Sequence, residues 1–118
     1  MMIKKQNLTD LVPKKLGELE MRTIPFSAGD GLTVLHEALP PNADSPSVIH
    51  DRTTEFVFVY KGRVRATVGG DLVELNKGDF LSIPPGTTHH FRAGMEGAEA
   101  ISLFVPGIDP ANPDGRIV

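Results

Sequence analysis

The sequence contains no cysteine and no tryptophan, and only one tyrosine. Without cysteine, the chain can form neither a disulfide bond nor a thiolate metal site. No apolar run approaches the length of a membrane-spanning helix, and the first residues lack the continuous apolar stretch of a secretory signal peptide. We therefore expect a cytoplasmic protein that does not interact with membranes.

A basic surface is also absent. The 118 residues carry a formal net charge of −3, so no nucleic-acid partner is expected. Hydrophobic residues make up 40% of the chain and charged residues 23%, which is ordinary for a soluble globular protein. The length allows one domain with a buried core and is too short for two. We expect a single domain over residues 1–118.

From residue 22 onward, the chain consists of short apolar runs that are rich in β-branched and aromatic residues. EFVFVY, RVRATV, LVEL, FLSI, THHFR and AEAISLFV recur at close intervals between turn residues. This pattern predicts an all-β fold, an antiparallel sandwich or barrel, with its core at about residues 22–105. Pro13 and Gly17 interrupt the N-terminal segment 1–21, which should contain at most a short helical turn. Residues 106–118 include three prolines and should form an extended C-terminal arm.

The stretch SVIHDRTTEFVFVYKG, residues 47–62, contains two candidate site residues, His50 and Glu55. Alternation along an extended chain puts Val48 and His50 on one face. In the following strand it puts Glu55 on the same face as Val57 and Val59. An unpaired carboxylate in apolar surroundings is costly unless a cation or hydrogen-bond donors meet it. Glu55 is therefore a candidate ligand rather than an ordinary surface residue.

The stretch GDFLSIPPGTTHHF, residues 78–91, supplies a second histidine. Its prolines and Gly86 predict a sharp turn, after which His89 and Phe91 share one face and His90 lies on the other. His50, Glu55 and His89 can then all point into a small barrel. Two imidazoles and one carboxylate suit a divalent ion such as Fe, Mn, Ni or Zn, and they leave positions open for water or substrate.

These motifs resemble those of the cupin superfamily over roughly residues 30–105. The first family motif is matched by His50, Glu55 and Gly62, with six residues between the last two. The second motif, a glycine, five residues, Pro-x-Gly, two residues and a histidine, is matched by Gly78, Pro84, Gly86 and His89. The resemblance implies a cupin-like double-stranded β-helix, a small jelly-roll barrel that is often dimeric. It also implies a metal held by three histidines and one glutamate.

Three positions depart from the family pattern. Val48 stands where the first histidine of the His-x-His pair is expected, and Ala93 replaces an asparagine. The glycine upstream in the first motif is also missing. The expected metal site therefore has a reduced ligand set.

Each candidate also has a simpler interpretation. His50 could be a histidine at the barrel mouth that bonds to Glu55 without a metal, and Glu55 could be protonated or neutralised by a buried arginine. His90 is expected to be a solvated neighbour. His36 shares a face with Val34 and Ala38. A core histidine is the favoured interpretation of His36, and a substitute fourth ligand is the alternative.

Phe56, Phe58 and Tyr60 point away from the face of Glu55. They could pack against a second layer or against the N-terminal segment, or they could form the interface of a homodimer, where aromatic residues concentrate. On the interior face, alternation predicts a largely apolar cavity lining. The residues expected there are Val34, Val57, Val64, Phe80 and Phe91.

Two functions from different classes follow. The first is an enzyme with a mononuclear metal site that acts on a small molecule, of the dioxygenase, isomerase or lyase type. The second is a barrel that binds a small molecule without metal and without catalysis. A metal-free isomerase with a histidine base is a third possibility. No organic cofactor is expected, and catalytic residues are not assigned.

Overall fold

The computed structural model describes residues 3–25 and 31–118, and nearly all of its regular structure is β-strand. Residues 1, 2 and 26–30 belong to the expected N-terminal segment and core, and they lie outside the described residues. Within the described ranges, no helix is long and apolar enough to cross a bilayer. The elements are η1 (Leu8–Asp10), β1 (Lys14–Leu16), β2 (Leu19–Thr23), β3 (Thr33–Leu39), β4 (Val48–His50), β5 (Thr54–Val68), β6 (Asp71–Asn76), β7 (Phe80–Ile83), β8 (His89–Val105) and β9 (Gly115–Ile117).

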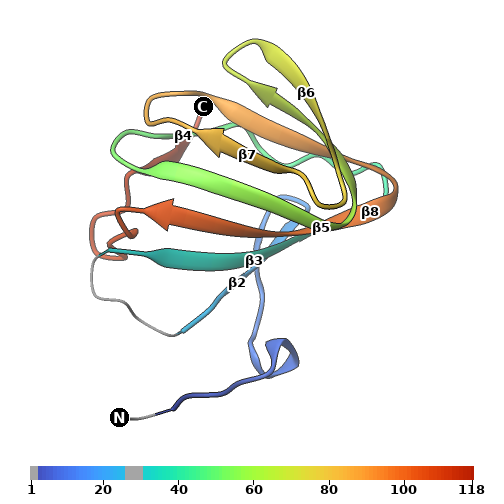
Figure 1. The fold of residues 1–118 in the computed structure, drawn as a ribbon. Coiled ribbons are helices and arrows are strands. Elements are labelled where there is room, and N and C mark those ends of the chain that lie inside the picture. The colour runs from blue at the N-terminus through green and yellow to red at the C-terminus, as the bar shows by residue number, and fades with distance from the viewer. Residues whose placement is uncertain (1–2, 26–30) are drawn as a thin grey trace.

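The strands form one curled antiparallel sheet (Figure 1). Its hydrogen-bonded order is β1-β2-β3-β8-β4-β9, and β5 joins through β8 while also pairing with β6 and β7. In Figure 1 the long strands β5 and β8 cross the molecule, with β6 above them and β3 and β2 below. The sheet thus curls around an interior as a small barrel does. This arrangement confirms the all-β prediction.

The two longest strands differ from the prediction, because the sequence pattern divides each of them into two. EFVFVY and RVRATV are both parts of β5, and THHFR and AEAISLFV are both parts of β8. The pairing of β5 with β8 shifts register between Val59 and Val64, where Gly62 adopts φ +73°. A Cβ atom on Gly62 would lie 2.0 Å from the carbonyl oxygen of Gly97, so this close approach requires glycine. Gly62 therefore bends a continuous strand instead of ending it.

Alternation along β5 separates an interior face from an exterior face. Glu55, Val57 and Val59 are buried, whereas Phe56 and Phe58 are exposed, as the pattern predicts. Glu55 is only 3% exposed and is set into an apolar wall. The interior valines join one hydrophobic core, whose other members are Leu19, Leu39, Ala43, Val64, Ala66, Leu75, Ile83, Ala93 and Ala98.

Both ends of the chain add strands that the sequence pattern did not reveal. The N-terminal segment contains the expected short helical turn as η1, but it also contains β1 and the start of β2. Pro13 precedes β1 and Gly17, at φ +60°, lies in the turn between β1 and β2, so both residues stand between elements rather than inside them. In the C-terminal arm, β9 follows the last proline and pairs with β4. The arm thereby lies against the strand that carries His50.

Candidate metal centre

Glu55 and His89 come from opposite walls of the curled sheet. Glu55 lies near the start of β5 and pairs with Phe104 near the end of β8, whereas His89 begins β8 and pairs with Val68 at the end of β5. The curl of the sheet brings the two side chains together across the interior. Nε2 of His89 lies 3.1 Å from Oε1 of Glu55.

His50 completes this group from β4, which lies beside β8 through the pairing of Val48 with His89. Nε2 of His50 is 3.8 Å from the same Oε1 atom of Glu55, and its ring stacks on that of His89 with centroids 5.9 Å apart. The proline-rich turn that precedes His89 is hydrogen-bonded to β4, because the N–H of Gly86 donates to the carbonyl of His50 at 2.7 Å. The structure therefore brings together the three predicted site residues. Their ligand atoms all lie within 4.8 Å of one another.

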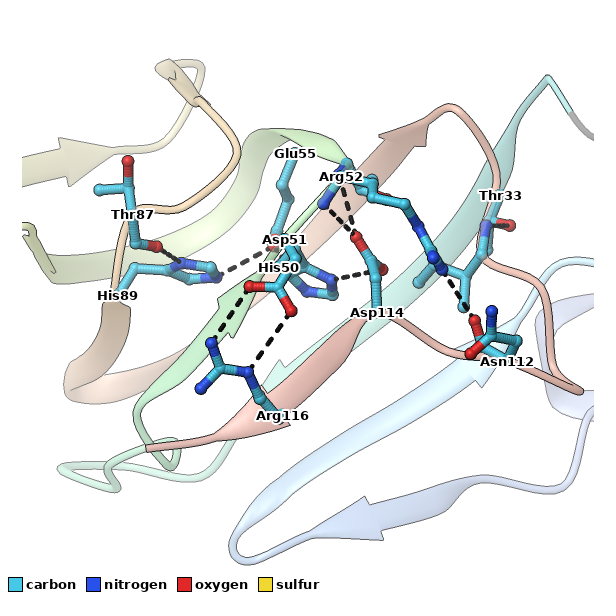
Figure 2. A network of polar contacts seen from close by, with 12 residues as sticks. Thr33, His50, Asp51, Arg52, Glu55, Thr87, His89, Asn112, Asp114 and Arg116 are labelled. Atoms are coloured by element: carbon cyan, nitrogen blue, oxygen red, sulfur yellow. Dashed lines mark hydrogen bonds and ion pairs between the residues drawn. The ribbon is translucent and has the colours of Figure 1, made fainter.

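The other ring nitrogen of each histidine is held by a partner outside this group (Figure 2). Nδ1 of His89 lies 3.0 Å from the carbonyl oxygen of Thr87, and Nδ1 of His50 lies 3.3 Å from Oδ1 of Asp114. Histidines that bind metals are usually oriented in this way, with one nitrogen donating to a carbonyl or carboxylate. In the neutral rings, Nε2 is then the atom with a free lone pair, and both Nε2 atoms face Glu55.

Asp114 is itself fixed by backbone groups. Its Oδ2 atom accepts the N–H groups of Arg52 at 2.8 Å and Thr53 at 3.0 Å. Burial alone would raise the pKa of Asp114, but these donors and His50 outweigh burial and lower the pKa to about 2. Asp114 is therefore an ionised acceptor that favours a proton on Nδ1 of His50.

The pKa of His89 is shifted in the opposite direction, by a different neighbour, Glu55. Burial would lower it, but the hydrogen bond and the negative charge of Glu55 outweigh burial and raise it. In the protein without a metal, a proton between His89 and Glu55 thus compensates the buried carboxylate. A divalent cation would replace that proton, because metal ligands must be deprotonated.

The donor set fits a divalent ion. Bonds of about 2.0–2.2 Å from a metal to nitrogen and oxygen place neighbouring donors roughly 3–3.5 Å apart. The two separations from Glu55 Oε1, 3.1 and 3.8 Å, are close to that range. Within the residues that the structure describes, no lysine or arginine bonds to Glu55. Among the described residues, Glu55 is therefore not neutralised by a buried arginine.

The three residues line a cavity of about 690 Å³ with a mostly apolar wall. Val48 lines this cavity beside His50, as the alternation predicts, and Phe91 does as well. Val57 and Val64 are buried and line a small adjoining space of about 30 Å³. The expectation for Phe80 is wrong, since it is 76% exposed, and Val34 is not among the residues that line either space. Their strands turn the neighbouring residues inward instead.

The two remaining histidines lie outside the group. His36 is buried, but its Nε2 atom bonds to the hydroxyl of Tyr60 at 2.7 Å and to Glu99 at 3.1 Å. It belongs to the other face of the sheet, so the favoured interpretation as a structural histidine holds. His90 has its Nδ1 atom 3.4 Å from Ser47, and it does not join the site.

Sequence reasoning missed three polar residues of the site. Glu37 lines the cavity, Ser102 is fully buried beside Glu55, and Asp114 orients His50. A signal for Glu37 exists, because it alternates with Leu35 and Leu39 just as Glu55 alternates with valines. For Ser102 and Asp114 we see no comparable signal. Neither is near the motifs in sequence.

Comparisons with known proteins agree with this architecture. A family model of the cupin domain matches residues 35–105. Quercetin 2,3-dioxygenase from Bacillus subtilis (strain 168) is 30% identical over 59 residues, which are 50% of this chain and 18% of that protein. The chain thus spans less than a fifth of the length of that relative.

Solved structures resemble the whole chain. Pac13, a nucleoside dehydratase, superposes with a TM-score of 0.83 at 14% identity, covering 99% of this chain and 92% of its own. A variant of Streptomyces PAC13 solved with uridine gives 0.83 at 15% identity, covering 100% of this chain and 92% of its own. KdgF from Halomonas sp. gives 0.80 at 17% identity, covering 94% of this chain and all of its own. At such identities these likenesses establish the fold alone. With the match of the family model over most of the barrel, they confirm the predicted double-stranded β-helix, and the chain belongs to the cupin family.

Proposed function

We propose that this cupin binds a divalent metal ion through His50, Glu55 and His89 and that it is an enzyme acting on a small organic molecule. The observation that supports this most strongly is the convergence of two Nε2 atoms on one carboxylate oxygen while both Nδ1 atoms are held from outside. Fe, Mn, Ni and Zn are the candidate ions, since all accept imidazole and carboxylate ligands. Such an ion supplies a Lewis acid that polarises a substrate oxygen.

The protein's own residues would bind and orient the substrate. The cavity of about 690 Å³ lies in the size range of small-molecule sites, and its mostly apolar wall includes His50, Glu55 and His89. Asp114 and the Thr87 carbonyl keep the two imidazoles in place, and the apolar wall limits access of water. Together these features favour a neutral or weakly charged organic molecule that presents an oxygen to the site.

Among reaction types we favour a lyase or isomerase, because a Lewis-acidic ion that polarises a substrate oxygen suits both reaction types and needs no oxidant. A dioxygenase is the second candidate. It is supported by the identity with quercetin 2,3-dioxygenase and by the two-histidine, one-carboxylate set, which is typical of non-haem iron oxygenases.

The first experiment measures metal content by mass spectrometry, before and after chelation, together with titration of the metal-free protein. His89→Gln should lose the metal, whereas His90→Gln removes the adjacent histidine, which is outside the site, and should retain it. If chelation changes neither metal content nor thermal midpoint, the metal proposal is wrong. A barrel that binds a small molecule without metal then becomes the leading interpretation.

The second experiment separates the two reaction types. The metal-loaded protein is incubated with a panel of small polyols, nucleosides and phenolic compounds, and products are followed by mass spectrometry while oxygen consumption is recorded. Loss of water or rearrangement without oxygen uptake supports the lyase or isomerase proposal. Oxygen uptake that depends on the metal supports the dioxygenase. If no compound changes, the catalytic proposal loses its support.

We also propose a homodimer that forms through the exterior face of β5, β7 and β8. An apolar groove of about 720 Å³ crosses this face, and its lining includes Phe56, Phe58, Phe80, Ile101 and Leu103. Exposed aromatic clusters of this kind often mark protein interfaces. Light scattering should show twice 12.7 kDa, and Phe80→Lys should reduce this to the monomer. Leu72→Lys, at an exposed position on β6, is the control and should remain dimeric.

A further inference from the structure

A serine hydroxyl stands between two carboxyl groups beside the candidate metal centre, the buried Glu55 and the half-buried Glu37. The Oγ atom of Ser102 makes a short hydrogen bond with Oε1 of Glu37 and lies 3.3 Å from Oε2 of Glu55. Ser102 is 0% exposed, Glu55 is 3% exposed, and Glu37 lines the same cavity. The three residues come from β8, β3 and β5, and because β8 pairs with both β3 and β5, their side chains are neighbours on one face of the sheet.

The hydrogen count of this arrangement limits its protonation state. A serine hydroxyl has one hydrogen and can donate only one full hydrogen bond. If Glu37 and Glu55 were both ionised, one carboxylate oxygen would face the lone pairs of Ser102 without a hydrogen between them. Two like charges would also lie close together, one buried and one half-buried, which is unfavourable where the dielectric constant is low. One of the two carboxyl groups must therefore carry a proton.

Of the two carboxyl groups, Glu37 is the one that carries the proton. Glu55 has its Oε1 atom directed at both histidines, where a negative charge is needed, whereas the described residues offer Glu37 no partner besides Ser102. We propose that Glu37 is a neutral carboxylic acid that donates to Ser102, which donates in turn to Oε2 of Glu55, so that Glu37 is a positioning residue of the site. This relay leaves Oε1 of Glu55 for the cation.

The pKa of Glu37 agrees with this assignment. Burial and the neighbouring charge of Glu55 raise it from 4.5 to about 8, although Ser102 and His89 oppose the increase. The titratable groups that face Glu37 are thus Glu55 and His89, one of each charge sign. At neutral pH the proton remains on Glu37.

The first test is independent of metal and is made on the metal-free wild type. Infrared spectroscopy at neutral pH should show the carbonyl band of a protonated carboxylic acid, with the expected shift in heavy water. The band should disappear in Glu37→Gln and remain in Glu99→Gln, a carboxylate on the other face of the sheet. Absence of the band from the wild type, or its survival in Glu37→Gln, would overturn the proposal.

The second test measures the affinity for Zn²⁺ or Ni²⁺ by calorimetry, and this arm rests on the proposed function. The amide of Glu37→Gln can donate to Ser102 as the acid does, so its affinity should stay within about threefold of the wild type. Glu37→Leu and Ser102→Ala remove the relay and should weaken binding by about 10–100-fold.

Two results of the titration would contradict the relay. If Glu37→Gln bound metal as weakly as Glu37→Leu, Glu37 would be ionised in the wild type and would attract the cation by its charge. If all three variants bound like the wild type, Ser102 would not position Glu55. A wild type that binds no metal would instead refute the proposed function, and the infrared test would still decide the protonation of Glu37.

Discussion

Strands β3, β5 and β8 carry polar side chains on both faces, and the two groups differ in how their carboxylates are neutralised. The inner cluster is Glu37, Glu55 and Ser102, beside the two site histidines. The outer cluster is His36, Tyr60 and Glu99. In the outer cluster, the hydroxyl of Tyr60 lies 2.7 Å from His36 and 3.2 Å from Glu99, while Nζ of Lys61 lies 3.3 Å from Glu99.

Lys61 lies beside the outer cluster as a permanent cation, whereas no lysine or arginine among the described residues bonds to the carboxyl groups of the inner cluster. Burial would raise the pKa of Glu99, but Lys61, Tyr60 and His36 outweigh burial and lower it. Glu99 is therefore an ionised carboxylate with a permanent partner. The inner carboxyl groups meet two histidines and a serine, and they depend on protons or on an added cation for their neutralisation. This difference explains how the same strands can carry a structural cluster on one face and the candidate metal centre on the other.

The largest expected effect tests this contrast between the two faces. Glu55→Gln removes the only charged ligand of the proposed set. It should weaken binding of Zn²⁺ or Ni²⁺ by more than about 100-fold, which exceeds the loss expected when a residue that only orients a ligand is changed. Glu99→Gln is the matched change on the outer face and should leave the affinity unaltered. Calorimetric titration of both variants checks this. Equal losses in the two would show that the clusters are not independent.

Asp114→Asn should produce the next largest effect. It removes an ionised acceptor from Nδ1 of His50, and changes of this kind cost about 10–100-fold in metal affinity. The amide has one oxygen where the carboxylate has two. That oxygen can either accept from His50 or keep the bonds from the N–H groups of Arg52 and Thr53, so one side loses its acceptor and stability should fall by about 1–3 kcal/mol.

The stability difference between wild type and Asp114→Asn should depend on pH. The folded pKa of about 2 lies below the ordinary 3.8, so the carboxylate stabilises the folded state above pH 3.8 and this contribution is lost as the pH falls toward 2. Melting curves of the two metal-free proteins should therefore converge in acid. Asp51→Asn, at an exposed neighbour that pairs with Arg116, is the control and should behave like the wild type at every pH. A gap that stayed constant from neutral to acid pH would contradict the role of Asp114.

Val48→His should extend the inner cluster by one ligand. Val48 lines the cavity beside His50 and pairs with His89, at the position where the family pattern has a histidine. With Mn²⁺, Ni²⁺ or Zn²⁺ present, the variant should gain more in thermal midpoint than the wild type, because a tighter site stabilises the folded state by mass action. A tenfold gain in affinity corresponds to about 1.4 kcal/mol.

Without metal, the same substitution should be destabilising. An imidazole in an apolar wall without a partner costs about 1–3 kcal/mol. Val34→His, on the face of the outer cluster, is the matched valine change and should show no dependence on metal. If Val48→His were destabilised and indifferent to every metal, His50 would not be part of a metal site.

The site residues that lie within sequence motifs can be predicted from the sequence. Those that reach the site from strands distant in the sequence cannot. His50, Glu55 and His89 follow from alternation and from the cupin motifs, and Gly62 follows from the first motif. Ser102 and Asp114 escape prediction, because they lie far along the chain and reach the site only through the pairing of β8 with β5 and of β9 with β4.

The wrong expectations also have physical causes. The alternation pattern places Phe80 in the cavity lining, but Leu81 and Ile83 occupy the opposite face of the strand, and Ile83 is the buried member of β7. Alternation defines two faces without deciding which one is interior. Val34 shows the same limit, since it shares a face with His36, and that face belongs to the outer cluster. Polar residues between apolar ones, as at Glu37, were the better guide to the cavity.

The smallest expected effect comes from the outer cluster itself. Tyr60→Phe removes a hydroxyl that bonds to both His36 and the ionised Glu99. Because Glu99 is half-exposed and keeps Lys61 as a partner, we expect the loss to be that of a typical hydrogen bond, about 0.5–1.5 kcal/mol. His36 and Glu99 keep their mutual contact at 3.1 Å, so the loss should fall in the lower half of that range. Urea unfolding measures it, and a parallel titration should give the metal affinity of the wild type. A loss of affinity as large as that of Asp114→Asn would mean that the two faces communicate through the sheet. The separation of a structural cluster from a metal centre would then be wrong, even if every inner-cluster prediction held.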